Sequence, residues 1–282
     1  MANIPQRVTE RLVAGIKKFK PVLSAAHENK ENESNTVIII TDMLSEVFGY
    51  AKYTEITSEI SIRGTFCDLA TQIEKKIQTL IEAKAIHYDL NSAHVTQAVA
   101  YAATKSVEWV MLTNGIIWQV YKVIVDKSVD HEKIVEIDFL NLDHHDTDQL
   151  EMIFRLTKEG WAKSALSDYY DQRQALSKYS IAAVLSTDSV LSAIRKNLKL
   201  LSPDTKITAE QIQSVLEKEV VNAELLQGDK ADEARRKVMK ASKRAERETV
   251  EKVPVTVAES TQNPPLTPCP SNPVPTTVSP PA

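Results

Sequence analysis

Asp68, Glu82 and Lys84 could together hold a metal ion and act on a phosphate. The polar run 74–76 lies between two apolar runs, as expected for the tip of a hairpin. If the hairpin is centred on Lys75, Asp68 lies directly opposite Glu82. Opposed carboxylates, with Cβ atoms about 4.5–5.5 Å apart, repel each other unless a positive charge lies between them. The spacing therefore predicts a divalent cation between the two side chains.

The ligand chemistry favours Mg²⁺, with Mn²⁺ as an alternative, because both carboxylates offer hard oxygen atoms. Lys84 follows Glu82 by two residues and would point into the same cleft, where its ammonium can orient a water molecule and offset charge on a phosphate. This combination predicts hydrolysis of a phosphodiester. The alternative is an exposed hairpin face on which the three side chains form an ordinary surface ion pair. The same alternation places four residues on the opposite face: Cys67, Leu69, Ile81 and Ala83.

Short β-branched and apolar runs around these residues predict strands. They cover residues 56–62, 66–73, 78–84, 109–113, 116–125 and 133–139. Apolar residues at helical spacing predict helices over 37–48, which closes at Gly49, and over 92–105. Helices alternating with strands in this order predict an α/β fold in which a mixed central sheet is flanked by helices.

The rest of the chain divides by composition. Composition and pattern predict a short basic helical segment over residues 1–28 and the α/β domain over residues 29–141. They predict a helical region over residues 142–249, with helix starts at Asp188 and Thr208. Residues 250–282 predict a disordered tail, because nine of the 12 prolines lie there. Within the helical region, 230–248 carries eight basic against four acidic residues, which fits a solvated charged helix or a nucleic-acid contact.

Overall composition excludes several classes of protein. The chain has 282 residues, 43% of them apolar, and a net charge of -4, so any nucleic-acid contact requires a local basic patch. Two cysteines, Cys67 and Cys269, cannot form a disulfide framework or a cysteine-rich zinc site. The sequence shows no apolar run of membrane-spanning length and no signal peptide, so we expect a cytoplasmic protein without a membrane segment. No glycine belongs to a phosphate-binding or dinucleotide-binding loop, so we expect no ATP site.

An ordered string of motifs resembles a known family, the N-terminal nuclease domain of the restriction subunit of type I restriction-modification enzymes, within the PD-(D/E)xK nuclease superfamily. The resemblance covers roughly residues 31–139 and implies a restriction-endonuclease-like core. The motifs are NESNT at 32–36, FGY at 48–50, Glu59, RG at 63–64, Asp68, IEAKA at 81–85, QAVAY at 97–101 and LTNGIIWQVY at 112–121.

The resemblance implies a role for each matching residue. Asp68 and Glu82 would be metal ligands, Lys84 the catalytic lysine, and Glu33 the helix carboxylate that bonds a metal-bound water. Gln97 and Tyr101, one helical turn apart, would help to hold DNA. Type I restriction subunits continue into an ATP-driven translocase. We expect no such motor here, because the sequence holds no phosphate-binding loop, and Cys67 stands where many superfamily members have proline.

Two histidines outside this set are further candidates. His144 and His145, between Asp143 and Asp146, could bind a metal, although a solvated loop is the simpler interpretation. For the whole chain we predict a Mg²⁺-dependent endonuclease acting on DNA. The alternatives are a catalytically inactive nucleic-acid-binding or regulatory module on the same fold, and an interaction protein whose helical region recruits another protein.

Overall fold

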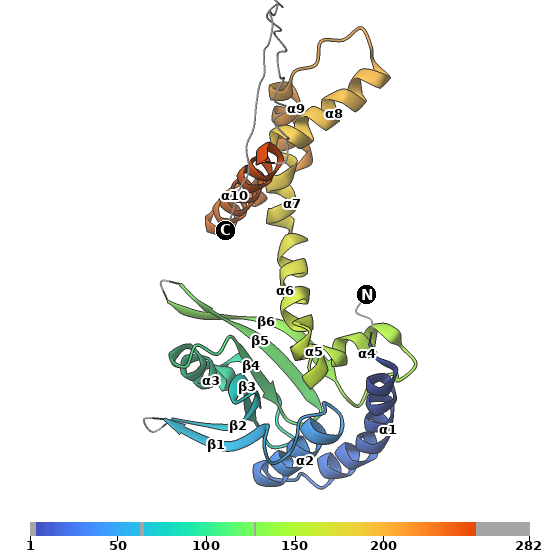
Figure 1. Cartoon of the computed structure of the whole chain (residues 1–282), viewed down its shortest axis with the longest axis vertical. Helices are drawn as coiled ribbons and strands as arrows, with labels where there is room; N and C mark the ends of the chain where they lie inside the picture. The colour runs from blue at the N-terminus through green and yellow to red at the C-terminus, as the bar shows by residue number, and fades with distance from the viewer. Residues whose placement is uncertain (1–3, 63–64, 127, 252–282) are drawn as a thin grey trace, which may run out of the picture. The chain divides into compact units, whose positions relative to one another are not determined.

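The computed structural model describes residues 4–62, 65–126 and 128–251 (Figure 1). Arg63, Gly64 and the segment from 252 onward, which includes Cys269 and nearly all of the tail expected from composition, lie outside the described residues. The chain divides into two compact units, residues 1–177 and residues 178–282. In the described part, no helix combines the length and the apolar character needed to cross a membrane.

Six strands of the first unit, within the residues described, form one mixed sheet in the order β1-β2-β3-β4-β5-β6 (Figure 1). The strands are β1 (Ile56–Ile62), β2 (Thr65–Ile73), β3 (Lys76–Ala83), β4 (Trp109–Thr113), β5 (Ile117–Val125) and β6 (Val129–Asp138). Neighbours pair antiparallel except β3 and β4, which are parallel and are joined by helix α3 (Ser92–Thr104). A parallel pair needs such a crossover. The predicted α/β fold with a mixed sheet flanked by helices is confirmed.

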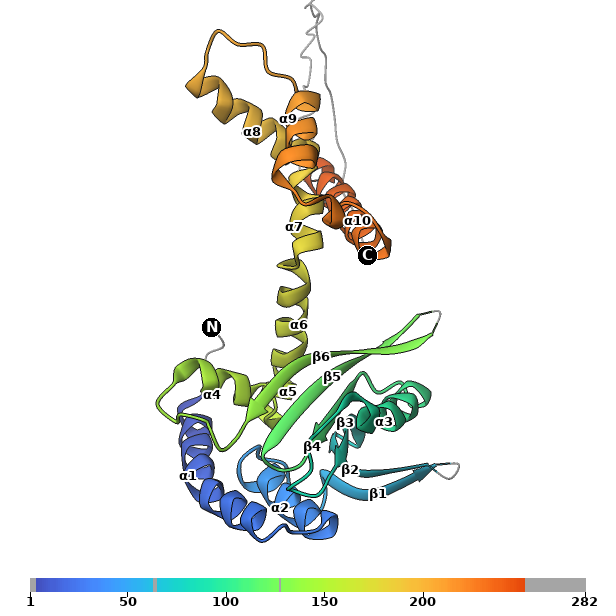
Figure 2. The ribbon, with the colours of Figure 1, turned by 180° about the vertical axis from the view of Figure 1, so that it is seen from behind.

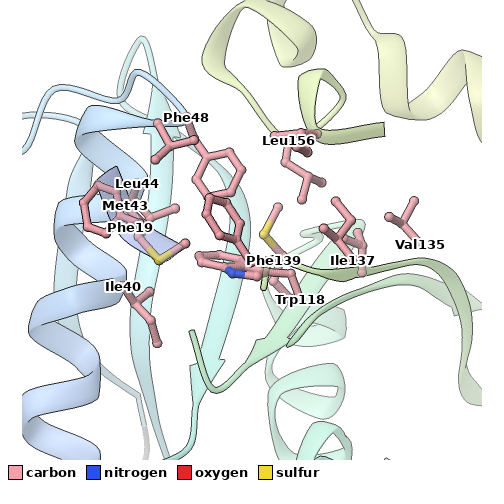
Figure 3. Close-up of a cluster of buried hydrophobic side chains, with 14 of the residues drawn as sticks. Phe19, Ile40, Met43, Leu44, Phe48, Trp118, Val135, Ile137, Phe139 and Leu156 are labelled. Atoms are coloured by element: carbon pink, nitrogen blue, oxygen red, sulfur yellow. The ribbon is translucent and has the colours of Figure 1, made fainter. Parts of the chain in front are cut away.

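Each face of the sheet is covered by its own apolar cluster. One cluster joins the sheet to α1 (Gln6–Glu28), α2 (Glu33–Glu46) and α4 (Thr147–Phe154), and the other joins it to α3. Figure 2 shows α3 well apart from α1, α2 and α4. In the first cluster Phe48 meets Trp118 edge to face, with ring centroids 4.9 Å apart (Figure 3). Helix α1 therefore shares a core with the sheet, through its apolar stripe Leu12, Ile16, Phe19 and Leu23.

The hairpin between β2 and β3 turns at Glu74 and Lys75, which both have positive φ (51° and 65°), as in a type I′ turn. Near this tip, Gln72 pairs with Ile77, one residue out of the register predicted for a turn centred on Lys75. A bulge lies between this pair and the next one away from the tip. Beyond the bulge, from Thr71 back to Leu69, the pairing matches the prediction, with Leu69 opposite Ile81. The bulge absorbs one residue, so the register next to the candidate site is the predicted one.

Arg11 of α1 fastens the end of α2 to α5 (Lys158–Ala162). Its guanidinium donates to Val47 O at 3.0 Å and makes two hydrogen bonds with the Glu159 carboxylate, at 2.6 and 2.8 Å. Partial burial alone would raise the pKa of Glu159, but the Arg11 guanidinium, a backbone hydrogen bond and the charge of Lys158 together outweigh it, and the pKa is lowered. The charged carboxylate therefore stabilises the first unit.

Glu159→Gln is accordingly expected to lower the free energy of unfolding by about 1–2 kcal/mol at neutral pH, because the pair is only partly buried. Because the folded-state pKa of Glu159 is lowered, its contribution is present above the ordinary glutamate pKa and disappears as the pH falls through the folded-state value. Urea titrations of both proteins at pH 7 and pH 3 measure the difference. An equal difference in the free energy of unfolding between the two proteins at both pH values would show that the carboxylate charge contributes nothing to stability.

The first unit ends with α6 (Ala165–Ala175), and the second contains helices joined by turns and no strand among its described residues. Its main helices are α7 (Lys178–Leu185), α8 (Asp188–Leu201), α9 (Ala209–Val215) and α10 (Asp229–Glu251), with α10 packed on α7. The predicted helix starts at Asp188 and Thr208 are confirmed, the latter with a complete capping box to Gln211. Helix α10 contains the basic run 230–248, whose contact with nucleic acid stays a prediction.

Candidate active site

Asp68 lies on β2 where the pairing of β2 with β3 ends. The last recorded pair is Leu69 with Ile81, and the next backbone donor on β3, the amide of Ala83, donates to Asp68 Oδ2 at 2.7 Å. A side-chain carboxylate thus takes the place of a backbone carbonyl at the end of the ladder. This hydrogen bond fixes the Asp68 carboxylate against the residue between Glu82 and Lys84.

Glu82 lies at the same end of β3, away from the hairpin tip, where the strand runs parallel to β4, and Lys84 is the first residue after the strand. The amide of Lys84 donates to Thr113 O at 2.9 Å, which extends the ladder one residue past the strand. The Lys84 ammonium donates to Glu82 Oε1 and to Ala83 O, each at 2.8 Å. The side chains of Glu82 and Lys84 are 12% and 22% exposed, so this ion pair is largely withdrawn from water.

Glu33 is the first residue of α2 and reaches the same ammonium, with its Oε2 3.6 Å from Lys84 Nζ. Asn32 caps the helix by accepting the amide of Asn35. One turn into α2, the buried hydroxyl of Thr36 accepts the amide of Ile86 at 3.0 Å. The start of α2 and the segment that follows Lys84 are therefore joined directly.

Burial and charge shift the pKa of both members of the ion pair. The pKa of Glu82 is raised, chiefly by burial. The Lys84 hydrogen bond and charge lower the pKa, but they do not offset burial and the repulsion by Asp68 and Glu33 combined. Burial alone would lower the pKa of Lys84, but Glu82, Glu33 and Asp68 together outweigh it and raise the pKa. Lys84 is therefore cationic at neutral pH and cannot serve as a base.

The sequence placed Cys67 on the face of Leu69 and Ile81, but the structure places it in the cluster on the α3 side. Cys67 lies beyond the last recorded pair of β2 with β3, where β2 stays paired with β1, so the register of the hairpin no longer fixes the face that its side chain takes. Burial, together with the charges of Glu82 and Asp68, raises the pKa of the Cys67 thiol to about 12, so the thiol is unreactive.

Gln97 and Tyr101, both on α3, have different surroundings. Gln97 is exposed, whereas Tyr101 is 6% exposed within the α3-side cluster. The Tyr101 hydroxyl is buried and has no hydrogen-bond partner among the described residues. Burial, with a smaller effect of Cys67, raises the pKa of Tyr101. The predicted contact of this pair with DNA stays a prediction.

The structure also brings together Asp143, His144 and His145, whose ligand atoms lie within 4.8 Å of one another. No other group of three such side chains meets this condition among the described residues. Asp143 and His145 are exposed, and the Asp146 carboxylate caps α4 by accepting the amides of Asp148 and Gln149. The loop therefore has a local structural role, and metal binding by it stays a prediction.

Two residues that sequence reasoning did not single out organise the site: Thr36 and Asn114. Asn114 is 6% exposed and donates to Ile86 O and Tyr88 O, at 3.3 and 3.0 Å. Its Oδ1 accepts two amides of the β4–β5 turn, those of Ile116 and Ile117. The Asn-Gly pair in the sequence predicts a turn. Nothing local in the sequence indicates that Asn114 also donates to the carbonyls of Ile86 and Tyr88.

Comparison with known proteins bears on the motifs that predicted this site. Residues 39–138 match the sequence profile of the type I restriction enzyme R protein N terminus. Searches of curated proteins and of solved structures returned no match. The matched segment runs from within α2 to the end of β6 and includes Asp68, Glu82 and Lys84. The resemblance drawn from the motifs is thus confirmed by the profile match over residues 39–138.

Proposed function

We propose that the protein is a Mg²⁺-dependent endonuclease that hydrolyses phosphodiester bonds of DNA, with a PD-(D/E)xK-type site. One observation carries the proposal: three separate elements bring Glu33, Asp68, Glu82 and Lys84 together. Lys84 Nζ lies 2.8 Å from Glu82 and 3.6 Å from Glu33, and Asp68 is hydrogen-bonded to the intervening Ala83. The restriction-enzyme family of residues 39–138 supports DNA as the substrate.

The donor set fits a hard divalent cation. Asp68 and Glu82 offer carboxylate oxygens, and together with Glu33 they set three carboxylates around the single ammonium of Lys84. Asp68 and Glu82 would hold the ion. A bound Mg²⁺ or Mn²⁺ would supply Lewis-acid stabilisation of the phosphate charge. Oxygen ligands without histidine or thiolate favour these ions over zinc.

The remaining side chains would bind and orient the reactants. Lys84 remains cationic, so it would position the attacking water and offset charge on the phosphate oxygens. Glu33 would hold the Lys84 ammonium and accept a hydrogen bond from water at the exposed side of the site, since half of its side chain is exposed. In the reaction the water oxygen bonds to phosphorus and gives up a proton to the solvent, the ester P–O bond breaks, and the leaving sugar oxygen takes up a proton from the solvent.

Supercoiled plasmid nicking tests the proposal. Purified protein is expected to nick plasmid with Mg²⁺ or Mn²⁺ and not with EDTA, and Glu82→Ala or Lys84→Ala is expected to abolish nicking. Lys52→Ala is the matched control, because Lys52 also forms a lysine–carboxylate pair, with Asp42, but on the exposed surface. That control should nick as the wild type does.

Equal nicking by the wild type and by both site variants would point to a contaminating nuclease and would overturn the proposal. DNA binding without nicking would favour an inactive nucleic-acid-binding or regulatory module. Binding to neither DNA nor metal would favour an interaction protein, with the helical region 142–249 as the partner surface.

A further inference from the structure

Directly after Lys84 the chain makes a tight turn over residues 85–88 that exposes two aromatic rings. The amide of Tyr88 donates to Ala85 O at 2.9 Å, which closes the turn. His87 and Tyr88 are both exposed, Tyr88 at 57%, and their ring centroids lie 4.8 Å apart at an interplanar angle of 39°. The two neighbouring rings form an aromatic surface that water can reach.

The backbone that carries these rings is fixed by buried side chains. Thr36, which is fully buried, accepts the amide of Ile86, and Asn114 donates to the carbonyls of Ile86 and Tyr88. Both anchors belong to other elements, α2 and the β4–β5 turn. The exposed rings therefore project from an ordered backbone, and ordering them against a ligand would cost only side-chain entropy.

The same anchors place the turn beside the candidate site. Lys84 N is bonded to Thr113 O, and Tyr88 O is bonded to the next residue, Asn114. The Cα atoms of Lys84 and Ala85 are one step apart, and those of Ala85 and Tyr88 lie at the two ends of a tight turn. The Cα atoms of Lys84 and Tyr88 are therefore about 11 Å apart at most. At about 3.4 Å per stacked nucleotide, a phosphate at Lys84 and a base at Tyr88 would lie within roughly three nucleotides of each other on one strand.

We propose that Tyr88, with His87 beside it, is a stacking platform for an unpaired nucleobase next to the phosphate that is cut. The inference rests on the proposed hydrolase function and narrows its substrate to DNA with single-stranded character near the cleaved bond. A paired base has both of its faces stacked inside the duplex, so it offers no face to an exposed ring. An unpaired base offers a face of any sequence, so the platform selects strandedness and not sequence.

Fluorescence anisotropy tests the platform with a labelled dT₁₂ strand and a labelled hairpin duplex, both in EDTA so that nothing is cut. Tyr88→Ala is expected to weaken binding of dT₁₂ by about 5- to 150-fold, the loss measured for one stacked base. Tyr88→Phe, which keeps the ring, is expected to bind dT₁₂ like the wild type, and duplex affinity is expected to change in neither variant. Tyr53→Ala is the matched control, because Tyr53 is 93% exposed but lies in the turn before β1.

The outcomes separate the platform from the hydrolase. If Tyr88→Ala binds dT₁₂ as tightly as the wild type while both nick plasmid, the platform is overturned and the hydrolase stands. If Tyr53→Ala loses as much affinity as Tyr88→Ala, the rings act non-specifically and the platform is again overturned. A wild type that neither binds dT₁₂ nor nicks plasmid overturns both.

Discussion

Glu82→Gln is expected to lose Mg²⁺-dependent DNA cleavage by at least about 100-fold and, without metal, to melt at a higher temperature than the wild type. Removing the charge removes a proposed ligand. It also removes a carboxylate whose pKa is raised, which means that the ionised form is less favourable in the folded protein than in the unfolded chain. Glutamine keeps an oxygen that can accept the Lys84 hydrogen bond.

The sign of this effect can be followed with pH. Because the folded-state pKa of Glu82 is raised, the wild type gains relative stability below the ordinary glutamate pKa and loses it as the pH rises through the folded-state value. The advantage of the glutamine variant should therefore be full at pH 7.5 and shrink toward pH 4. Mg²⁺ should raise the melting temperature of the wild type, by binding the folded state, and leave the variant unchanged.

Glu136→Gln is the matched control for these melting curves. Glu136 also pairs with a lysine, but the Lys133 hydrogen bond lowers its pKa. Its replacement should therefore give no gain in melting temperature and no loss of nicking. A glutamine variant at position 82 that melts lower than the wild type at pH 7.5 would show instead that the Glu82–Lys84 pair stabilises the fold.

Asn114→Ala is expected to destabilise the first unit by about 3–5 kcal/mol and to reduce nicking in the fraction that remains folded. The change removes four hydrogen bonds at once and leaves the carbonyl of Ile86 and the amides of Ile116 and Ile117 without these partners. It also releases the turn that follows Lys84. Urea unfolding and the nicking rate below the unfolding transition measure the two effects.

Asn114→Asp separates the two halves of this network. The carboxylate can still accept hydrogen bonds from the amides of Ile116 and Ile117. It cannot donate to the carbonyls of Ile86 and Tyr88, to which the asparagine side chain donates. This variant should be less stable than the wild type at pH 7.5 and recover part of the difference at pH 5, where the introduced carboxyl group, once protonated, can donate. Asn141→Ala, which removes an exposed contact with Asp138, should change little. A loss as small as that of the control would show that Asn114 does not fix the turn.

Local patterns in the sequence predict most of the sheet. β-branched runs predict β1 and β4 to the residue, and the polar tip 74–76 predicts the register of Leu69 with Ile81. The bulge near Gln78 escapes prediction because the turn type fixes the pairing at the tip, and a turn centre alone does not reveal an extra residue. The sequence of α1 shows an apolar stripe. Whether this stripe packs against the core of the sheet depends on contacts with residues remote in sequence, which the local pattern does not reveal.

The candidate site is predicted less completely than the strands. Residue type and spacing single out Asp68, Glu82 and Lys84, because alternation along a strand is a local property. Thr36 and Asn114 bind backbone groups 50 and 28 residues away, and such hydrogen bonds leave no periodic trace. The burial of Tyr101 is equally hidden, since its spacing from Gln97 fits an exposed pair as well as a buried one.

Helix α2 has a practical consequence for the boundaries of this domain. The profile match begins at residue 39, after Glu33 and Thr36 and inside the helix. An excised fragment that starts there would lack a carboxylate beside Lys84 and the hydroxyl that anchors Ile86. Sequence likeness therefore marks out a shorter stretch than the one that builds the candidate site, and a shortened version of this protein should begin upstream of Asn32.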